Sequence, residues 1–345
     1  AVADAGIDWR HVESAYTGTA TTSIALSRLM YRHLGASGIS MVQVENASAS
    51  GSSAFRQACI EVASGLVDVA IAVGVDKPGP LIGPKVAAGI QDLMGARFSP
   101  FTSFALLANR YIHKYGAKPE QLAAVAVKNS ANGALNPNAQ RQKARTLDEV
   151  MDSTLISGPL TRLQCCPIGE GAAAVIVASD DAIKRLNVDA SRAVRVMSSV
   201  ARSEAVYTDE NYDTALIREG TGVALADAGI TAADLDVIEL HDAFTVEELL
   251  YLEAMGLAPA GQAGAQLMEG QFDIGGRVAV SPSGGLLAMG HPIGPTGVGQ
   301  VCEISMQLRG EAGVRQHAGA RYGLAHMAGI GAVCLVHILA APGHG

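Results

Sequence analysis

The sequence predicts an α/β protein built from two similar halves, with a helical region inserted into the first half. Apolar runs typical of strands alternate with apolar residues at helical spacing along most of the chain. Residues 3–7 (ADAGI) recur as residues 226–230, and a few polar residues and a strand pattern follow each copy. Between residues 77 and 167 the alternation stops, and glycine and proline punctuate several short helical patterns. These observations predict a duplicated βαβ plan with one insert.

The composition agrees with a large buried core. Of the 345 residues, 49% are hydrophobic, only 17% are charged and 39 are glycine. The formal net charge is −8 and no Lys/Arg cluster exceeds two or three residues, which argues against a nucleic-acid partner. An anionic ligand would therefore need local basic side chains or backbone groups.

The remaining bulk features indicate a cytoplasmic protein. No apolar run reaches the roughly 18 to 20 residues needed to span a bilayer, and no secretory leader pattern is visible. The cysteines are odd in number and lie mostly in apolar segments, so we expect them to be reduced and buried. They are Cys59, Cys165, Cys166, Cys302 and Cys334. Their spacing, and that of the histidines, suggests no metal site.

The first half is expected to follow a strand–helix order. Residues 67–73 (VDVAIAV) form a continuous apolar run typical of a buried parallel strand. We expect strands at 12–16, 39–44, 67–73 and 172–178, and helices at 23–34 and 54–65. Residues 1–6 resemble the end of a helix with Gly6 in the C′ position, so we expect about one strand and one helix to be missing before them.

The insert and the second half complete the predicted plan. In the insert we expect helices at 84–94, where Pro84 suits the opening position, and at 101–115, 119–132 and 147–151. In the second half we expect strands at 194–200, 237–240, 322–326 and 332–339, and helices at 213–228, 245–255 and 295–308. The second ADAGI copy has a full strand and helix before it, which supports the missing segment.

One stretch has the form of a nucleophile elbow. The strand at 39–44 leads into small residues, and Gly51 is expected to make a tight turn before the helix at 54–65. Such a strand, turn and helix present one side chain at a helix N-terminus, where backbone N–H groups and the dipole favour developing negative charge. Ser48 occupies that point.

Three histidines lie at strand ends or in glycine-rich loops. His241 follows an apolar strand in ELHDAF, His291 lies in GHPIGPTG just before a helix, and His326 begins HMAGIG. A lone histidine in a turn is more often structural, but three of them with an elbow offer a nucleophile position, a general base and oxyanion donors. The other histidines are expected to pack or to lie on the surface, and Cys165 and Cys166 are expected to be buried by packing.

Together these residues resemble the thiolase family, most closely its lipid-transfer-protein (sterol carrier protein) type. The resemblance rests on VENASASGSSA, NPNAQ, LQCCPIGEGAAAVIVAS, ELHDAF, SPSGGLLAMGHPIGPTG and HMAGIGAV, in the right order over nearly the whole chain. It implies two βαβαβαββ halves in an αβαβα five-layer sandwich. It implies an N-terminal half at 1–76 and 168–190, a loop domain that holds coenzyme A at 77–167, and a C-terminal half at 191–345. A homodimer or larger assembly is also implied.

The resemblance carries over to individual residues, and the sequence departs from it at several. His291 stands where the family activates the nucleophile, His241 where it helps form an oxyanion hole, and His326 begins the family's HNxG motif. The family's nucleophilic cysteine is Ser48 here, and its second cysteine, the acid/base, is Ala243. The asparagines of two motifs are Ser281 and Met327. By the same resemblance, three residues are expected to contact the acyl-CoA substrate: Ser283, Gly284 and Gly329.

These departures leave three functions open. A serine hydroxyl is far less acidic than a thiol, and loss of a proton shuttle costs roughly 10²–10⁴-fold, so ordinary thiolysis is disfavoured. One hypothesis is retro-aldol cleavage of a β-hydroxyacyl-CoA without an acyl-enzyme, similar to thiolase-like aldolase subunits of steroid side-chain degradation that act with a small OB-fold partner. The second is an acetyl-CoA acyltransferase in which Ser48 is an engineered substitution. The third is a non-catalytic acyl-CoA- or lipid-binding subunit. Coenzyme A enters as part of the substrate, and no permanent cofactor is expected.

Overall fold

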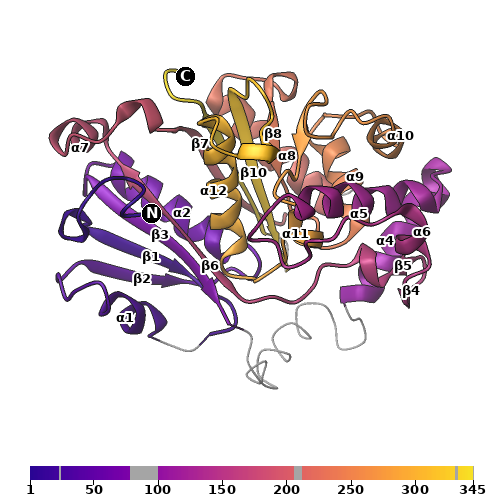
Figure 1. Cartoon of the computed structure of the whole chain (residues 1–345), viewed down its shortest axis with the longest axis horizontal. Helices are drawn as coiled ribbons and strands as arrows, with labels where there is room; N and C mark the ends of the chain where they lie inside the picture. Colours follow the sequence, from indigo (N-terminus) through magenta and orange to yellow (C-terminus); the bar gives the residue numbers. More distant parts are fainter. Residues whose placement is uncertain (23–24, 78–99, 206–211, 331–332, 345) are drawn as a thin grey trace.

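The computed structural model describes residues 1–22, 25–77, 100–205, 212–330 and 333–344, and it contains two large mixed sheets (Figure 1). The first sheet has the strand order β2-β1-β3-β6. Strand β1 is parallel to both β2 and β3, and β6 is antiparallel to β3. The strands are β1 (Ser14–Gly18), β2 (Ser40–Val44), β3 (Val69–Asp76) and β6 (Gly171–Ala178).

The second sheet repeats this arrangement. Its order is β7-β11-β10-β8-β9, with β8 parallel to β9 and β10, and β10 antiparallel to β11. Strand β7 adds an antiparallel neighbour to β11. The strands are β7 (Arg195–Ser203), β8 (Val237–Glu239), β9 (Ala279–Val280), β10 (Tyr322–Gly329) and β11 (Val333–Ala340). Four strands thus match in order and direction between the sheets, which confirms the predicted duplication.

The ADAGI repeat has the same conformation in both halves. Gly6 and Gly229 each adopt φ 68°, the left-handed region that closes a helix. The N–H of Ile7 donates to the carbonyl of Val2 at 3.3 Å, and that of Ile230 to the carbonyl of Leu225 at 3.1 Å. Repeated sequence therefore encodes a repeated chain reversal ahead of β1 and β8.

Helices fill the space between the sheets and cover their outer faces (Figure 1). In the centre, α2 contacts β1 and β3, and α12 contacts both β6 and β10. On the outer face of the first sheet, α1 and α7 pack against alternate residues of β3, while α8 and α9 cover the second sheet. The helices are α1 (Leu26–Tyr31), α2 (Ser50–Ala63), α7 (Asp180–Arg185), α8 (Tyr212–Ala228), α9 (Thr245–Ala254) and α12 (Thr296–Leu308). The layers follow the α/β/α/β/α order of the thiolase fold.

The central helices touch through glycines, and this corrects one expectation. Gly51 does not make the turn after β2, because it lies in the first turn of α2. A Cβ on Gly51 would overlap the carbonyl oxygen of Gly294, and one on Gly297 would overlap the Ser52 side chain. Glycine is needed at these positions for the close approach of α2 and α12, and α2 begins four residues earlier than the sequence pattern suggested.

The insert packs against the second half. Its helices α4 and α5 contact α9, and α5 also contacts α10 and α11. The described elements are α4 (Pro100–Tyr115), α5 (Pro119–Ala134), α6 (Leu147–Met151), β4 (Leu155–Ser157), β5 (Leu160–Thr161), α10 (Ala263–Met268) and α11 (Gly285–Ala288). The expected helix at 84–94 lies outside the described residues. The β4–β5 hairpin, α7, α10, α11 and β9 were not expected, because such short elements show no clear periodicity.

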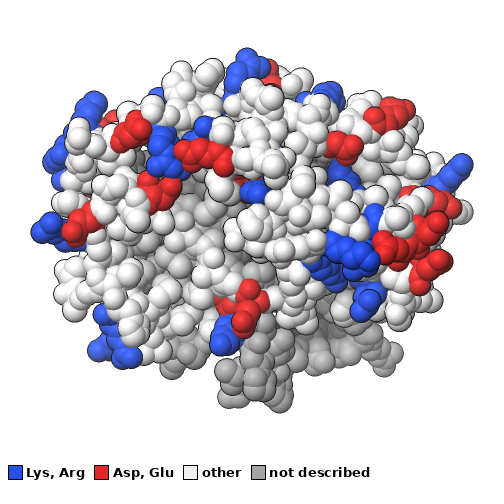
Figure 2. Space-filling view, viewed as in Figure 1, with Lys and Arg blue, Asp and Glu red and all other residues white. Residues whose placement is uncertain are grey.

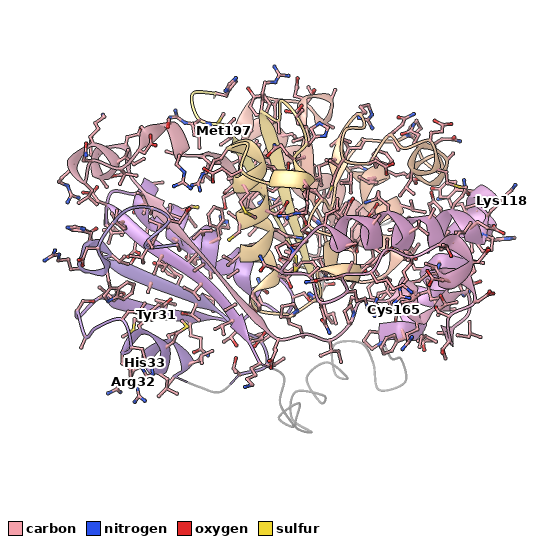
Figure 3. The ribbon with its side chains drawn as sticks, in the orientation of Figure 1. Tyr31, Arg32, His33, Lys118, Cys165 and Met197 are labelled. Atoms are coloured by element: carbon pink, nitrogen blue, oxygen red, sulfur yellow. The ribbon has the colours of Figure 1, made fainter. Side chains whose placement is uncertain are left out.

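Charged side chains are mixed on the visible surface. Lysines, arginines and acidic residues alternate over the face shown in Figure 2, without a broad basic region. At the end of α1, the Arg32 and His33 side chains are exposed, whereas the neighbouring Tyr31 is buried (Figure 3). Within the described ranges, no helix is both long enough and apolar enough to cross a membrane.

Asp76, at the end of β3, joins the two halves. Its carboxylate accepts hydrogen bonds from the Thr19 hydroxyl (2.7 Å), the Thr21 N–H (2.9 Å) and hydroxyl (2.8 Å), and the Gly294 N–H (2.5 Å). Burial alone would raise the pKa of Asp76, but the hydrogen bonds outweigh it and hold the pKa below its ordinary value. The loop that carries His291 is therefore anchored to the first sheet by a buried charge.

Replacing this charge should destabilise the fold in a pH-dependent way. We expect Asp76→Asn to lower the free energy of unfolding by at least about 2 kcal/mol at pH 7, because an amide cannot accept all these bonds. The pKa of Asp76 is lower in the folded than in the unfolded protein. The difference between native protein and variant should therefore persist above about pH 4 and shrink as the pH falls through the folded-state pKa.

Urea unfolding at several pH values measures this difference. Asp181→Asn, which removes a carboxylate that is 89% exposed, serves as the control and should leave the midpoint nearly unchanged. A variant at Asp76 that is as stable as the native protein at pH 7 would contradict the anchoring role.

Candidate active site

Ser48 lies at a strained turn between β2 and α2. Ala47 adopts φ 48°, which a residue with a side chain seldom occupies. The Ser50 hydroxyl donates to the Ala47 carbonyl at 2.6 Å and accepts from the Asn46 N–H at 2.8 Å. These bonds hold the turn, so Ser48 is presented just ahead of the first helical turn and is buried.

Ser48 is hydrogen-bonded to His291. The Ser48 Oγ lies 3.1 Å from His291 Nε2, and His291 Nδ1 lies 2.9 Å from the Thr296 hydroxyl. Since that hydroxyl donates to the Pro292 carbonyl, it accepts from Nδ1, and Nε2 is left to accept from Ser48. Burial, and then the neighbouring His241, lowers the pKa of His291 well below its ordinary value. His291 is thus a neutral base beside the serine.

His241 lies next to His291 and is bonded to a carboxylate. The two imidazole rings are perpendicular, with centroids 5.4 Å apart. His241 Nδ1 lies 2.9 Å from Glu247 Oε1, and both side chains are buried. Glu247 is a site residue that the sequence reasoning missed, although its position in the turn of helix after HDAF was a usable signal.

His326 completes the cluster from β10. Its Nδ1 accepts a long bond, 3.5 Å, from the backbone N–H of His241, and its ring contacts Tyr251 with centroids 5.4 Å apart. Burial, and then the neighbouring His241 and His337, lowers the pKa of His326 to about 3, so the ring is neutral at pH 7. The structure therefore brings together Ser48, His291, His241 and His326.

The three residues expected to bind substrate have structural contacts of their own. The Ser283 hydroxyl donates to Glu239 at 2.8 Å and its carbonyl accepts from Asn136 at 2.8 Å, so its polar groups are engaged by protein. A Cβ on Gly284 would lie 2.7 Å from Gly133 Cα, and one on Gly329 would lie 2.8 Å from the Asn46 carbonyl oxygen. Their assignment to substrate binding stays a prediction.

All five cysteines are free, and burial raises the pKa of each. The pKa rises to about 12 for Cys59 and Cys334 and to about 11 for Cys165 and Cys302. Cys166 lies against the site, because its N–H donates to the Ala243 carbonyl at 2.8 Å. Burial, with added repulsion from Glu247 and Asp242, raises its pKa furthest. No cysteine is therefore prepared to be a thiolate at neutral pH.

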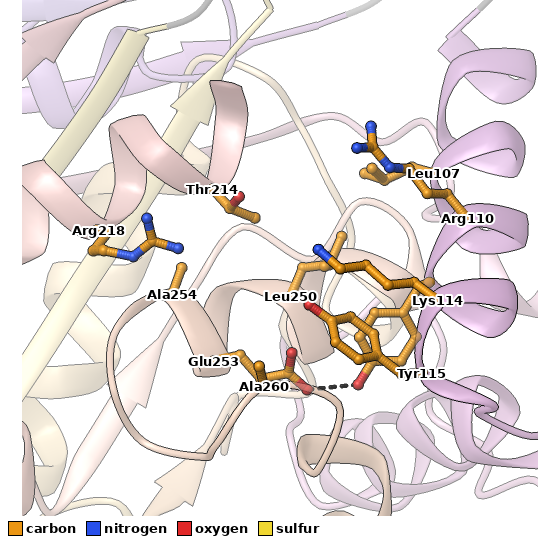
Figure 4. Close-up of a pocket in the computed structure, with 11 residues that line it drawn as sticks. Leu107, Arg110, Lys114, Tyr115, Thr214, Arg218, Leu250, Glu253, Ala254 and Ala260 are labelled. Atoms are coloured by element: carbon orange, nitrogen blue, oxygen red, sulfur yellow. Dashed lines mark hydrogen bonds between the residues drawn. The ribbon is translucent and has the colours of Figure 1, made fainter. Parts of the chain in front are cut away.

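Over the part of the chain that the structure describes, no group of three or more His, Cys, Asp or Glu side chains is arranged to hold a metal ion. A pocket of about 340 Å³ opens between α4, α8 and α9 (Figure 4). Three cationic residues line it, and the Glu253 carboxylate beside them accepts from the Tyr111 hydroxyl at 2.6 Å. The cations are Arg110, Lys114 and Arg218. This is the kind of local basic site that an anionic ligand would require.

Comparison with known proteins agrees with this geometry. Residues 198–341 match the family model "Thiolase C-terminal domain-like", and residues 4–105 match "Beta-ketoacyl synthase, N-terminal domain". The chain is 36% identical to the acetyl-CoA acetyltransferase of Methanothermobacter thermautotrophicus, over 98% of this chain and 91% of that protein. It is 37% identical to sterol carrier protein 2 of Gallus gallus, over 99% of this chain but only 66% of that protein. Among solved structures, the Ltp2-ChsH2(DUF35) aldolase is similar with a TM-score of 0.83 and 25% identity, covering 100% of this chain and 91% of that one.

The raised pKa values of the cysteines predict slow reaction with thiol reagents. At pH 7, iodoacetamide should label none of the five in the native protein within a time that fully labels glutathione, because only the thiolate reacts. In Ser48→Cys, the introduced thiol next to His291 should label quickly.

Peptide mass spectrometry after a timed quench measures the labelling, and urea-unfolded protein gives the full value of five. Fast labelling of Cys166 in the native protein would contradict the assignment of the site as lacking a reactive thiol.

Proposed function

Since the chain belongs to the thiolase superfamily, and within it to the lipid-transfer-protein type, we propose that it cleaves a carbon–carbon bond of a β-hydroxyacyl-CoA by a retro-aldol reaction. The observation that carries this proposal is a site with histidines but no reactive thiol. Ser48 stands at the elbow, residue 243 is alanine, and burial raises the pKa of every cysteine. Acyl transfer through a cysteine thioester needs a reactive thiol, and the described residues of this site include none.

The retro-aldol step needs only groups of the kinds that the cluster contains. A neutral imidazole takes the proton of the β-hydroxyl, and the oxygen's electron pair forms the new carbonyl as the Cα–Cβ bond breaks. The released pair moves through the α-carbon to the thioester oxygen, giving an enolate that hydrogen-bond donors stabilise. The proton then returns to the α-carbon, so the products are a ketone or aldehyde and a shorter acyl-CoA. No carbon atom of the substrate is bonded to the enzyme at any stage.

His326 and a cluster of phenylalanines beside the site are suited to particular parts of the substrate. His326 Nδ1 accepts a hydrogen bond, so its Nε2 carries the hydrogen of the neutral ring and is our candidate for donation to the enolate oxygen. Beside the site, Phe104 stacks on Phe244 with centroids 4.4 Å apart, and Phe101 meets the same ring edge-on. This aromatic wall supports an apolar acyl group, for which a steroid side chain is our candidate.

The similar proteins support two different reactions. The Ltp2-ChsH2(DUF35) complex is named an aldolase, which supports the retro-aldol proposal. The methanogen relative is named an acetyl-CoA acetyltransferase, and the 3.1 Å contact between Ser48 and His291 supports acyl transfer through serine as the second candidate. In that case the acyl group would pass from the thioester sulfur to Ser48 Oγ, with His291 taking the hydroxyl proton.

We also propose that the cationic pocket receives the phosphates of coenzyme A. Its charge is opposite to that of the ligand, in a protein whose overall charge is negative. It lies at the C-terminal end of α9, the helix that begins directly after HDAF. Coenzyme A would enter as part of the substrate, and we propose no permanently bound cofactor.

Assembly is a further part of the proposal. Strand β2 is an edge strand of mostly exposed residues, SMVQV, without a charge or proline to block pairing. We infer that two copies pair along β2 as a homodimer. A small OB-fold partner is our candidate for a second subunit, supported by the two-protein name of the aldolase. A cytoplasmic location is proposed on the five free cysteines.

Removing the Ser48 hydroxyl separates the two reactions. Ser48→Ala should keep retro-aldol cleavage of a branched 3-hydroxyacyl-CoA within about tenfold, because one hydrogen bond is lost and no covalent step is affected. An acyltransferase that depends on this serine should lose at least about 10³-fold.

Mass spectrometry follows the carbonyl product and the shorter acyl-CoA released from the 3-hydroxyacyl-CoA. A second assay, with a 3-oxoacyl-CoA and free coenzyme A, measures thiolysis. Ser48→Cys is the matched variant. Rapid thiolysis by the native protein, or loss of aldol cleavage in Ser48→Ala, would contradict the proposal.

Reversing one pocket charge should weaken binding of coenzyme A selectively. We expect Lys114→Glu to raise the KM for an acyl-CoA about tenfold, equivalent to about 1.4 kcal/mol, with less effect at high salt. The KM for the same acyl group on pantetheine, which lacks the nucleotide, should not change.

Lys118→Glu changes an exposed lysine outside the pocket lining, at the start of α5 (Figure 3), and is the control. Equal effects of Lys114→Glu on both thioesters would contradict the assignment of the pocket to the nucleotide part.

A further inference from the structure

We propose that Glu247 is a positioning residue that fixes the tautomer of His241, so that Nε2 of His241 accepts the proton of the β-hydroxyl. This inference rests on the proposed retro-aldol function and names the base that the function requires. Glu247 makes no direct contact with the reacting atoms in this account. It acts through the imidazole to which it is bonded.

The Glu247 carboxylate is surrounded by hydrogen-bond donors. Oε1 lies 2.9 Å from His241 Nδ1 and accepts from the Tyr251 hydroxyl at 3.0 Å. Oε2 accepts from the Phe244 N–H at 2.8 Å. The side chain of Glu247 is only 1% exposed, so water does not compete for these oxygens. The result is a carboxylate held in one orientation by a helix N-terminus and a tyrosine.

This contact determines which nitrogen of His241 carries a hydrogen. A carboxylate is an acceptor only, so a nitrogen that bonds to it must carry the proton. In the neutral ring, Nδ1–H therefore leaves a lone pair on Nε2. That Nε2 atom is buried and has no hydrogen-bond partner among the described residues. It lies in the same cluster as His291, whose ring is perpendicular to that of His241, with the two ring centroids 5.4 Å apart.

The other two histidines have their nitrogens differently engaged. His291 Nε2 already accepts from the Ser48 hydroxyl. His326 Nδ1 accepts from the His241 N–H, so its Nε2 is a donor. Of the three histidines, His241 is the one whose ring nitrogen is both unprotonated and unengaged by the described protein. This distinguishes the base from the donor, and it differs from the oxyanion role that the family resemblance implies for this position.

The β-hydroxyl proton moves to His241 Nε2, the C=O bond forms, the Cα–Cβ bond breaks, and its electron pair passes to the thioester oxygen. The imidazolium formed is stabilised by Glu247 across the Nδ1–H contact. It then returns the proton to the α-carbon, which restores the starting tautomer.

Glu247→Gln tests the inference because the amide can fit in one orientation only. The Phe244 N–H needs an acceptor, so the amide oxygen takes the place of Oε2 and the amide NH₂ faces His241 Nδ1. Nδ1 must then accept, which moves the ring hydrogen to Nε2. We expect kcat to fall by about 10²–10³-fold while KM changes less than about threefold.

The tautomer itself is read by ¹⁵N NMR of substrate-free protein labelled at histidine, with His241→Gln used to assign the signals. The native protein should show Nδ1–H with unprotonated Nε2, and Glu247→Gln should show the reverse. Glu269→Gln makes the same chemical change at an exposed glutamate outside the site and is the control, with an unchanged His241 tautomer and unchanged kcat.

The native spectrum alone can overturn the inference, even if Glu247→Gln does not fold. A native His241 that carries hydrogen on Nε2, or on both nitrogens at pH 7, has no lone pair to act as the base. Full kcat in Glu247→Gln with a reversed tautomer also overturns the base role. If the native protein shows no aldol cleavage, both the proposed function and the base role of His241 are wrong. The NMR spectrum still tests the tautomer of His241, because it does not depend on turnover.

Discussion

The buried carboxylate of Asp76 is the interaction on which the site geometry depends. It belongs to the first sheet, yet it accepts the N–H of Gly294 in the loop that carries His291. Ser48 is fixed by the first half and His291 by the second, so their 3.1 Å contact requires the halves to be held in register. Glycine contacts between α2 and α12 bring the halves close, and Asp76 fixes the loop once they are close.

Hydrogen bonding determines which nitrogen of each histidine in the site donates a hydrogen bond and which accepts one. His291 is a neutral acceptor because Thr296 takes its other hydrogen, and His241 is held by Glu247. His326 is a buried neutral ring at a strand end. The same rings in other hydrogen-bond surroundings would form a different site. The absence of a reactive thiol is equally a matter of surroundings, since burial raises the pKa of the nearby Cys166.

The sequence predicted the fold well and the site only in part. Strand β3 was found because its alternate residues face two apolar layers, and the ADAGI repeat revealed the duplication. The role of Gly51 was misread, because the need for glycine arises from contact with Gly294, far along the chain. Glu247 and Thr296 were missed for a similar reason. Periodicity reports which face of an element is buried, whereas these residues act through single hydrogen bonds that only the folded chain reveals.

We propose that carbon–carbon cleavage proceeds without a covalent acyl-enzyme. Rapid-quench intact-mass spectrometry of the protein during steady-state turnover of a 3-hydroxyacyl-CoA tests it most directly, with product formed in the same samples as proof of turnover. We expect the mass of the unmodified chain at every time point. An added acyl mass that rises before product and maps to the peptide containing Ser48 would contradict it and establish serine acyl transfer instead.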